Sequence, residues 1–205
     1  MQAYMKSAMP YRGVSSAGVK AVCREVFAGH RLPSFEAWEA TVMALWRDAE
    51  YREERYAAIS LTGARYYREH QTPSAMPLYE ELVTTGAWWD YVDDVAAHRI
   101  GPMLLTHGAV VRPLMLSWST APDMWKRRTS IICQVVARER TDLRLLYACI
   151  EPNLEAKDFF IRKAIGWSLR AYAWIDPDEI AAFVARQGDR LSGLSRREAL
   201  KNIHA

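Results

Sequence analysis

The chain has 205 residues; half are hydrophobic, a quarter are charged, and the formal net charge is +3. This composition is typical of a globular protein and excludes an intrinsically disordered chain. The length suits one domain or one small solenoid, and no apolar run approaches the roughly 18 residues that a membrane helix needs.

The sequence also argues against several other classes of protein. The N-terminal segment lacks the apolar core of a signal peptide, so we expect a soluble cytoplasmic protein. Cys23, Cys133 and Cys149 show neither a paired framework nor metal spacing, which indicates reduced thiols. The histidines form no metal-binding motif, so no metal site is indicated, and the absence of a Gly-rich phosphate loop gives no support to enzymes of that class.

Helical periodicity runs through nearly the whole chain, and no strand pattern appears, so the predicted fold is all-α. Apolar residues recur at spacings of three and four in residues 34–46, 53–67, 86–98, 127–139, 159–173 and 176–187. Asp176 and Ser195 have the sequence context of helix N-caps. Prolines, including Pro113, are expected to separate the helices.

Four of the helical segments begin alike, and their starts are spaced like a repeat. The starts at Glu53, Trp88, Trp125 and Phe160 lie 35, 37 and 35 residues apart. This period is typical of stacked helix pairs in HEAT or armadillo repeats. We therefore predict a HEAT-like helical-repeat α-solenoid with a concave basic groove, formed by residues 1–205 as a single domain; an irregular helical bundle is the alternative.

The segment that begins at Trp88 differs from the other repeats because it carries carboxylates beside aromatic residues. Asp93 stands where the other repeats have small or apolar residues, and an unpaired buried carboxylate would cost several kcal/mol. Trp89 and Asp93 are four residues apart and therefore share one face of a helix. In the simpler interpretation, the tryptophans anchor the core and the aspartates form a solvated face.

Basic residues cluster near the starts of successive repeats and allow two interpretations. Lys126, Arg127, Arg128, Arg162 and Lys163 form a stripe suited to a phosphate backbone, or they are surface cations that pair with acidic residues such as Asp142, Glu155 or Asp158. Gly166 is unusual inside a helix, where it costs about 1 kcal/mol relative to Ala. Its missing side chain would allow a partner helix or a ligand backbone to approach closely, next to Trp167.

Several motifs resemble those of the AlkD-type DNA alkylation-repair glycosylases, a HEAT-like-repeat family. They extend over most of the chain and include YMKSAMPYRGV, ALWRDAEYREERYAA, PLYEELVTTGAWWDYVDDVA, MWKRRTSIICQ, KDFFIRKAIGWSLRAYA and LSGLSRREALKNI. The resemblance implies excision of N3- and N7-alkylated purines from double-stranded DNA, without metal or cofactor and without flipping the base into a pocket. The partner is then DNA that contains alkylated purines, and the expected protein is a nucleoid-associated monomer of a bacterial type.

The resemblance also implies the roles of particular residues. The catalytic aspartate falls on Asp93, the two aromatic walls beside the lesion fall on Trp89 and Trp167, and the backbone-gripping arginine falls on Arg128. Tyr4 lies in the tyrosine-containing motif of the family and is expected to contact DNA. The given sequence begins almost on this tyrosine-containing motif, so the family's usual preceding helix is expected either to be missing or to lie outside it. Asp90 and Asp94 are expected to be structural or solvated.

Such a site makes chemical sense. A cationic alkylpurine is already a good leaving group, and an aspartate would stabilise the oxocarbenium-like sugar and orient the attacking water. Two alternatives remain open at the level of sequence. One is a non-catalytic HEAT-like binder of branched or damaged DNA, and the other is a protein-binding solenoid with no nucleic-acid role.

Overall fold

The computed structural model of the chain describes residues 2–203. Within these residues the regular structure consists of helices, as predicted, and no strand occurs. No helix among them is long and apolar enough to cross a membrane. The chain divides into two compact units, residues 1–78 and 79–205, and the boundary falls inside helix α5 (Met76–Gly86).

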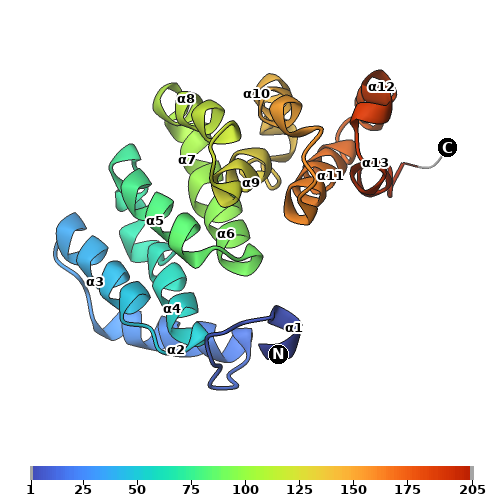
Figure 1. Cartoon of the computed structure of the whole chain (residues 1–205). Helices are drawn as coiled ribbons and strands as arrows, with labels where there is room; N and C mark the ends of the chain where they lie inside the picture. Colours follow the sequence, from blue (N-terminus) through green and yellow to red (C-terminus); the bar gives the residue numbers. More distant parts are fainter. Residues whose placement is uncertain (1, 204–205) are drawn as a thin grey trace. The chain divides into compact units, whose positions relative to one another are not determined.

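The first unit is helical, and its second and third helices, α2 and α3, pack on α4. Its helices are α1 (Gln2–Met5), α2 (Ser16–Gly29), α3 (Phe35–Arg47) and α4 (Arg52–Thr62), followed by short 3₁₀ turns at Arg65–His70 and Pro73–Ala75 (Figure 1). Helix α3 follows the predicted periodicity, because it buries Trp38, Val42 and Trp46. The loop before α2 is held by Glu53, whose carboxylate accepts backbone hydrogen bonds from residues 12–14 at 2.9–3.1 Å.

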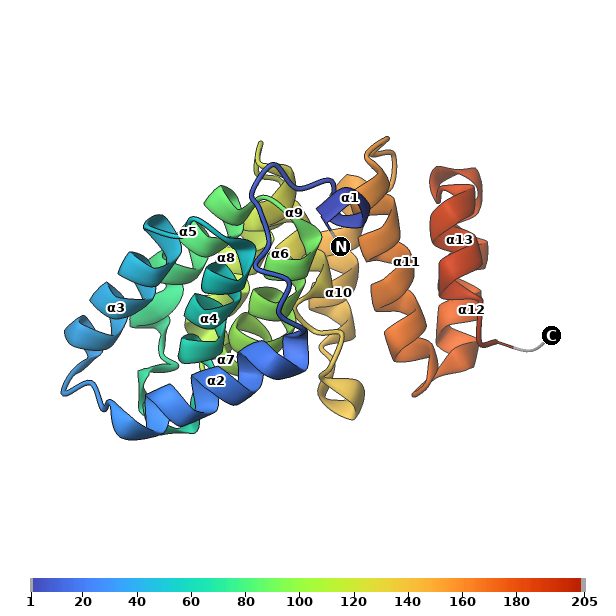
Figure 2. The same cartoon turned by 90° about the horizontal axis from the view of Figure 1, so that it is seen from below.

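The second unit is a stack of helices in two rows. Its helices after α5 are α6 (Trp89–Val95), α7 (Gly101–Thr106), α8 (Gly108–Ser119), α9 (Met124–Ile132), α10 (Leu143–Ile150), α11 (Phe159–Ala173), α12 (Pro177–Gln187) and α13 (Gly193–Ala199). A π-helical turn, Ala96–Ile100, joins α6 to α7, and 3₁₀ turns lie at Arg138–Arg140, Glu151–Asn153 and Gly188–Arg190. Helices α6, α9, α11 and α13 pack in succession, and α10 packs on α8 and α9 (Figures 1 and 2).

Hydrogen bonds between successive helices of these rows confirm the predicted repeat. Ser168 on α11 donates to the carbonyl of Ile131 on α9, 37 residues earlier in the chain. In the other row, Asn153 donates to the carbonyl of Ser119, 34 residues earlier. The aromatic residues that open three repeats also meet, with ring centroids of Trp125 and Phe160 5.0 Å apart and those of Trp88 and Phe160 5.4 Å apart. The second unit is therefore an α-solenoid in its packing.

Two local expectations from the sequence are wrong. Pro113 lies inside α8 instead of between helices. The N-cap of helix α13 is Ser192, three residues before the expected cap. Ser195 therefore lies within the helix, and its hydroxyl donates to the carbonyl of Arg162 on α11 at 2.9 Å. The expected cap at Asp176 is confirmed, because its side chain accepts from the Glu179 N–H at 2.9 Å.

Gly166 allows helix α13 to approach α11 closely. A Cβ atom at this position would lie 2.4 Å from the Glu198 Cβ and 2.9 Å from the Ser195 carbonyl oxygen, and both atoms belong to α13. The unusual glycine of the sequence therefore serves a partner helix.

We expect Gly166→Ala to destabilise the protein, because the added methyl group forces α11 and α13 apart. Overpacking costs about 1–3 kcal/mol, which exceeds the gain of up to about 1 kcal/mol in helix propensity. Thermal unfolding followed by circular dichroism measures the effect. Gly108→Ala is the matched control, because a Cβ atom there meets nothing within 4 Å. An unchanged midpoint for Gly166→Ala would contradict the close contact.

Candidate active site

Helix α6 places Trp89 and Asp93 on one face, one turn apart. Trp88 is the N-cap, and Asp90 lies in the first turn, where a negative charge interacts favourably with the helix dipole. Trp89 and Asp93 are both partly exposed, whereas Tyr91, Val92 and Val95 on the same helix are fully buried. Burial of the opposite face therefore fixes the direction in which Trp89 and Asp93 point.

Asp93 forms a two-pronged ion pair with Arg128 of the next helix in the row, α9. Nε of Arg128 donates to Oδ1 of Asp93 and Nη2 donates to Oδ2, both at 2.7 Å. The side chain of Arg128 is only 6 % exposed, while that of Asp93 is 16 % exposed. This ion pair compensates for the burial of a carboxylate at a position where the other repeats have small or apolar residues. One edge of the Asp93 side chain remains open to solvent.

The guanidinium of Arg128 is itself held in place by helix α11. Its Nη1 donates to the carbonyl of Phe160 at 2.6 Å, and its Cζ lies 5.9 Å from the centroid of the Phe160 ring. Arg128 thus joins α6, α9 and α11 through three charge-assisted hydrogen bonds, which are shorter and stronger than neutral ones. Because the fork is fixed on two sides, it holds the Asp93 carboxylate in one orientation.

Opposing effects act on the pKa of Asp93. Burial raises the pKa above its ordinary value, and the neighbouring Asp90 adds to this, while the hydrogen bonds and the charge of Arg128 lower it; the net direction is upward. The carboxylate is therefore more basic than one on the surface, and Arg128 is the group that opposes this upward shift of its pKa.

The other cations of the predicted DNA-binding stripe have partners within the protein. Lys126 donates to Glu80, and Lys163 donates to Glu198 at 2.8 Å. Arg127 and Arg162 occupy equivalent positions in their repeats, and each donates to a backbone carbonyl six residues earlier, those of Ala121 and Ala156. These cations therefore stabilise loops and contacts between helices within the protein.

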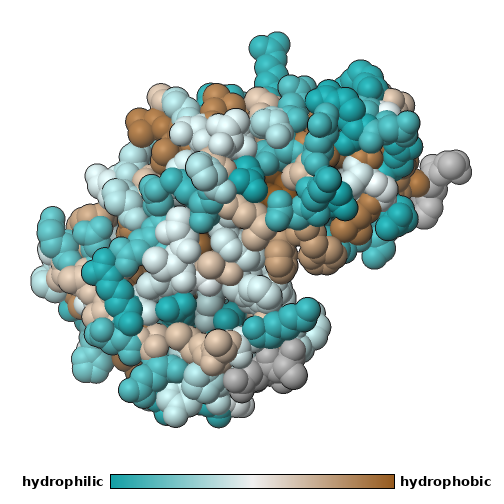
Figure 3. Space-filling model, viewed as in Figure 1, coloured by the Kyte–Doolittle hydropathy of each residue, from teal (hydrophilic) through white to brown (hydrophobic). Residues whose placement is uncertain are grey.

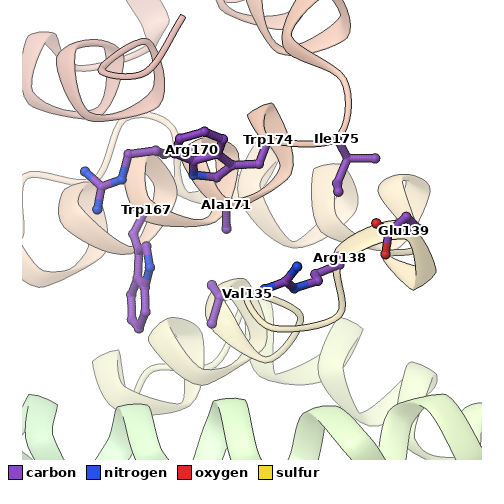
Figure 4. Close-up of a pocket in the computed structure, with 8 residues that line it drawn as sticks. All are labelled: Val135, Arg138, Glu139, Trp167, Arg170, Ala171, Trp174 and Ile175. Atoms are coloured by element: carbon purple, nitrogen blue, oxygen red, sulfur yellow. The ribbon is translucent and has the colours of Figure 1, made fainter.

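The remaining predicted residues take no part in this ion pair. Trp167, on α11, is partly buried and lines a cavity of about 590 Å³ (Figure 4). Within the described part of the chain its ring is not in contact with that of Trp89. Tyr4 belongs to the first unit and is 76 % exposed. Asp94 pairs with Arg99 at 3.3 Å, as expected for a structural residue.

The pairing of Asp93 with Arg128 was not predicted from the sequence, although both residues were predicted to belong to the site. A usable signal was present, because the two residues are 35 residues apart, which is one period of the repeat. The same separation links Lys163 to Glu198. In these two cases, opposite charges 35 residues apart in the sequence form contacts between neighbouring repeats.

Among residues 2–203 no group of His, Cys, Asp or Glu side chains is arranged to hold a metal ion. The fold and the site define an all-helical solenoid protein in which a partly exposed carboxylate is gripped by an arginine of the next repeat. Residues 1–203 match the family model described as DNA alkylation repair enzyme, and the chain belongs to this family. This membership assigns the protein a role in DNA repair, as an enzyme that acts on DNA.

A solved structure agrees with this assignment. The chain is similar to a structure described as "Predicted DNA alkylation repair enzyme from Enterococcus faecalis", with 26% sequence identity and a TM-score of 0.89. The match covers 99% of this chain and 92% of that one. A comparison with curated proteins finds no match.

Proposed function

We propose that the protein is a monofunctional DNA glycosylase that hydrolyses the N-glycosidic bond of N3- and N7-alkylpurines in duplex DNA. The observation that carries this proposal is the Asp93 carboxylate, which is held by Arg128 at 2.7 Å and remains partly exposed one helical turn from Trp89. A fixed, ionised carboxylate beside an aromatic side chain is suited to stabilising a cation at the protein surface.

The chemistry requires little more than such a carboxylate. An alkylated purine carries positive charge and leaves without prior protonation, so the charge that develops on the deoxyribose is the main barrier. The sugar passes through an oxocarbenium-like state, as in glycoside hydrolysis. Asp93 would stabilise that state electrostatically and orient or deprotonate the water that attacks the sugar carbon. One unit charge at about 4 Å and an effective dielectric constant of 20 contributes roughly 4 kcal/mol, or about a thousandfold in rate.

Trp89 and Trp167 would form the aromatic walls of this site. Indole faces attract cationic and C–H groups, and they exclude water, which strengthens the field of the carboxylate. We infer that the damaged nucleotide lies against these rings without entering an enclosed base-specific pocket, so that selectivity arises largely from the lability of the cationic base.

Arg128 has two possible roles in this scheme. In its present arrangement it positions Asp93 and keeps it ionised. A guanidinium has five N–H groups, and three are engaged with Asp93 and Phe160, so a phosphate contact would use one of the remaining two. We propose that positioning of Asp93 is the main role and that the phosphate contact is secondary.

The proposal is tested by incubating the protein with methylated duplex DNA and chromatographing the released bases. We expect free 3-methyladenine or 7-methylguanine, together with abasic sites in the DNA, while unmodified duplex releases no base. Tight, salt-sensitive DNA binding with no base release from the methylated substrate would overturn the proposal in favour of a non-catalytic DNA binder.

A further inference from the structure

The cavity that contains Trp167 has chemical features that its proposed role as a wall beside the lesion does not use. It lies between α11 and the segment that follows α9, and it is lined by Val135, Arg138, Glu139, Trp167, Arg170, Ala171, Trp174 and Ile175. Its volume of about 590 Å³ falls within the range of small-molecule sites. In Figure 4, the side chains of Trp167 and Arg138 extend into the space between these two segments.

Trp174 is the most unusual residue of this cavity, because its side chain is largely in water. It is 73 % exposed, although it follows Trp167 by two helical turns on the same face of the region around α11. The face of the molecule in Figure 3 is mostly hydrophilic, with hydrophobic residues exposed in separate places. An indole that stays exposed beside a cavity is suited to stacking on a flat partner, and nucleobases stack on aromatic rings regardless of sequence.

Arg138 supplies a charge to the same cavity. Its φ angle of +53° lies in the left-handed region, which is strained for a residue other than glycine and which often marks functional positions. In the described part of the chain its guanidinium has no hydrogen bond or ion pair. By contrast, the other arginine of the cavity, Arg170, is paired with Glu198. Arg138 therefore keeps its charge available for an external anion.

A flat apolar surface and a free cation on the two sides of one cavity match the two parts of a nucleotide. Glu139, the acidic residue of the lining, is on the exposed 3₁₀ turn at the opposite end of the cavity from Trp167 in Figure 4. We propose that this cavity binds one unpaired nucleotide of the DNA, with its base stacked on Trp174 and its phosphate at Arg138. The inference rests on the proposed function, because Trp167 belongs to both sites and brings the cavity next to the damaged strand.

Binding of unmodified DNA tests this proposal independently of excision. We would compare a fully paired duplex with one that carries a single-nucleotide bulge of 2-aminopurine, by fluorescence anisotropy and by the fluorescence of the probe. We expect tighter binding to the bulged duplex and quenching of the probe on binding. In Trp174→Ala the preference falls by about 5- to 100-fold, the range expected for loss of one base–aromatic stack. In Arg138→Gln affinity for bulged DNA falls and depends less steeply on salt.

Two control variants separate this site from general effects. Phe159→Ala removes another exposed aromatic side chain of α11, and Arg190→Gln removes an exposed arginine elsewhere in the same unit; neither is expected to change the preference for bulged DNA. Equal binding of both duplexes by the wild-type chain, or an unchanged preference in Trp174→Ala, would overturn the proposal. If Arg138→Gln lowered the affinity for both duplexes equally, and the probe was not quenched on binding, Arg138 would contact only the DNA backbone. This result would also overturn the proposal. Asp93→Asn is expected to keep the preference for bulged DNA whether or not Asp93 is catalytic. Failure of the glycosylase proposal is therefore distinguishable from failure of the nucleotide-binding proposal.

Discussion

Asp93→Asn is expected to lower the rate of base release by about a thousandfold while the affinity for duplex DNA is retained. The substitution removes the charge that opposes the developing sugar cation, and that charge is worth roughly 4 kcal/mol at about 4 Å. Asn preserves the size of the side chain and one acceptor for Arg128. Single-turnover release of 7-methylguanine from methylated duplex measures the rate, and anisotropy measures binding.

Asp94→Asn is the matched control for this experiment. Asp94 is the next residue of α6, and its carboxylate pairs with Arg99 instead of with Arg128. Loss of a partly exposed ion pair changes stability by at most about 1 kcal/mol, so we expect base release close to that of the wild type. An unchanged rate in Asp93→Asn, with wild-type folding, would remove Asp93 from the mechanism.

Arg128→Gln is expected to affect both stability and the pH dependence of base release. Removing one partner of a buried ion pair costs about 3–5 kcal/mol, and the partial exposure of Asp93 favours the lower value of about 3 kcal/mol. For a chain of this length, that loss lowers the thermal midpoint by roughly 10 °C. Arg112→Gln, which breaks the exposed pair with Asp142, is the control and is expected to cost less than about 1 kcal/mol.

The pH dependence follows from the upward shift of the Asp93 pKa. Burial raises this pKa while Arg128 lowers it, and base release needs the ionised carboxylate. Activity is therefore lost as the pH falls through the raised pKa, at a higher pH than for an ordinary aspartate. In Arg128→Gln the opposing charge is gone, so the acidic limb of the pH–rate profile moves to still higher pH. A limb that stays in place while activity falls would show that Arg128 acts mainly through DNA contacts.

The repeat architecture was predictable because it leaves a strong mark on the sequence. Bulky residues that open each repeat must meet their counterparts in the neighbouring repeats, and the ring contacts among Trp88, Trp125 and Phe160 show that they do. Gly166 was equally informative, because a glycine inside a helix destabilises the helix and therefore suggests that another group approaches closely at that position. A partner helix was one of the two groups expected to approach Gly166, and the other was a ligand backbone.

The partners of charged side chains were less predictable, for a physical reason. Spacing within a helix shows which residues share a face, but a long arginine or lysine side chain chooses among several carboxylates and carbonyls within its reach. Arg162 bonds to the Ala156 carbonyl, and Lys163, its neighbour, bonds to Glu198 of the next repeat. The predicted basic stripe and the alternative of internal pairing were therefore indistinguishable until side-chain positions were known.

The start of α13 was misplaced for a related reason. Ser192 and Ser195 both precede residues that suit a first turn, and the hydroxyl groups of the two serines lie 2.8 Å apart. The contact of Ser195 with the Arg162 carbonyl belongs to the packing of α13 on α11, which local sequence patterns do not record. The cavity beside Trp174 likewise depends on how the segment after α9 turns at Arg138, a backbone conformation that few residues other than glycine adopt.

The grip of Arg128 on Asp93 crosses the junction between two successive repeats, since the carboxylate is on α6 and the guanidinium is on α9. Solenoids bend through small rotations at such junctions. A twist of a few degrees here would loosen the clamp around the carboxylate without unwinding either helix. The reactivity of the proposed centre is in this way tied mechanically to the curvature of the helical stack.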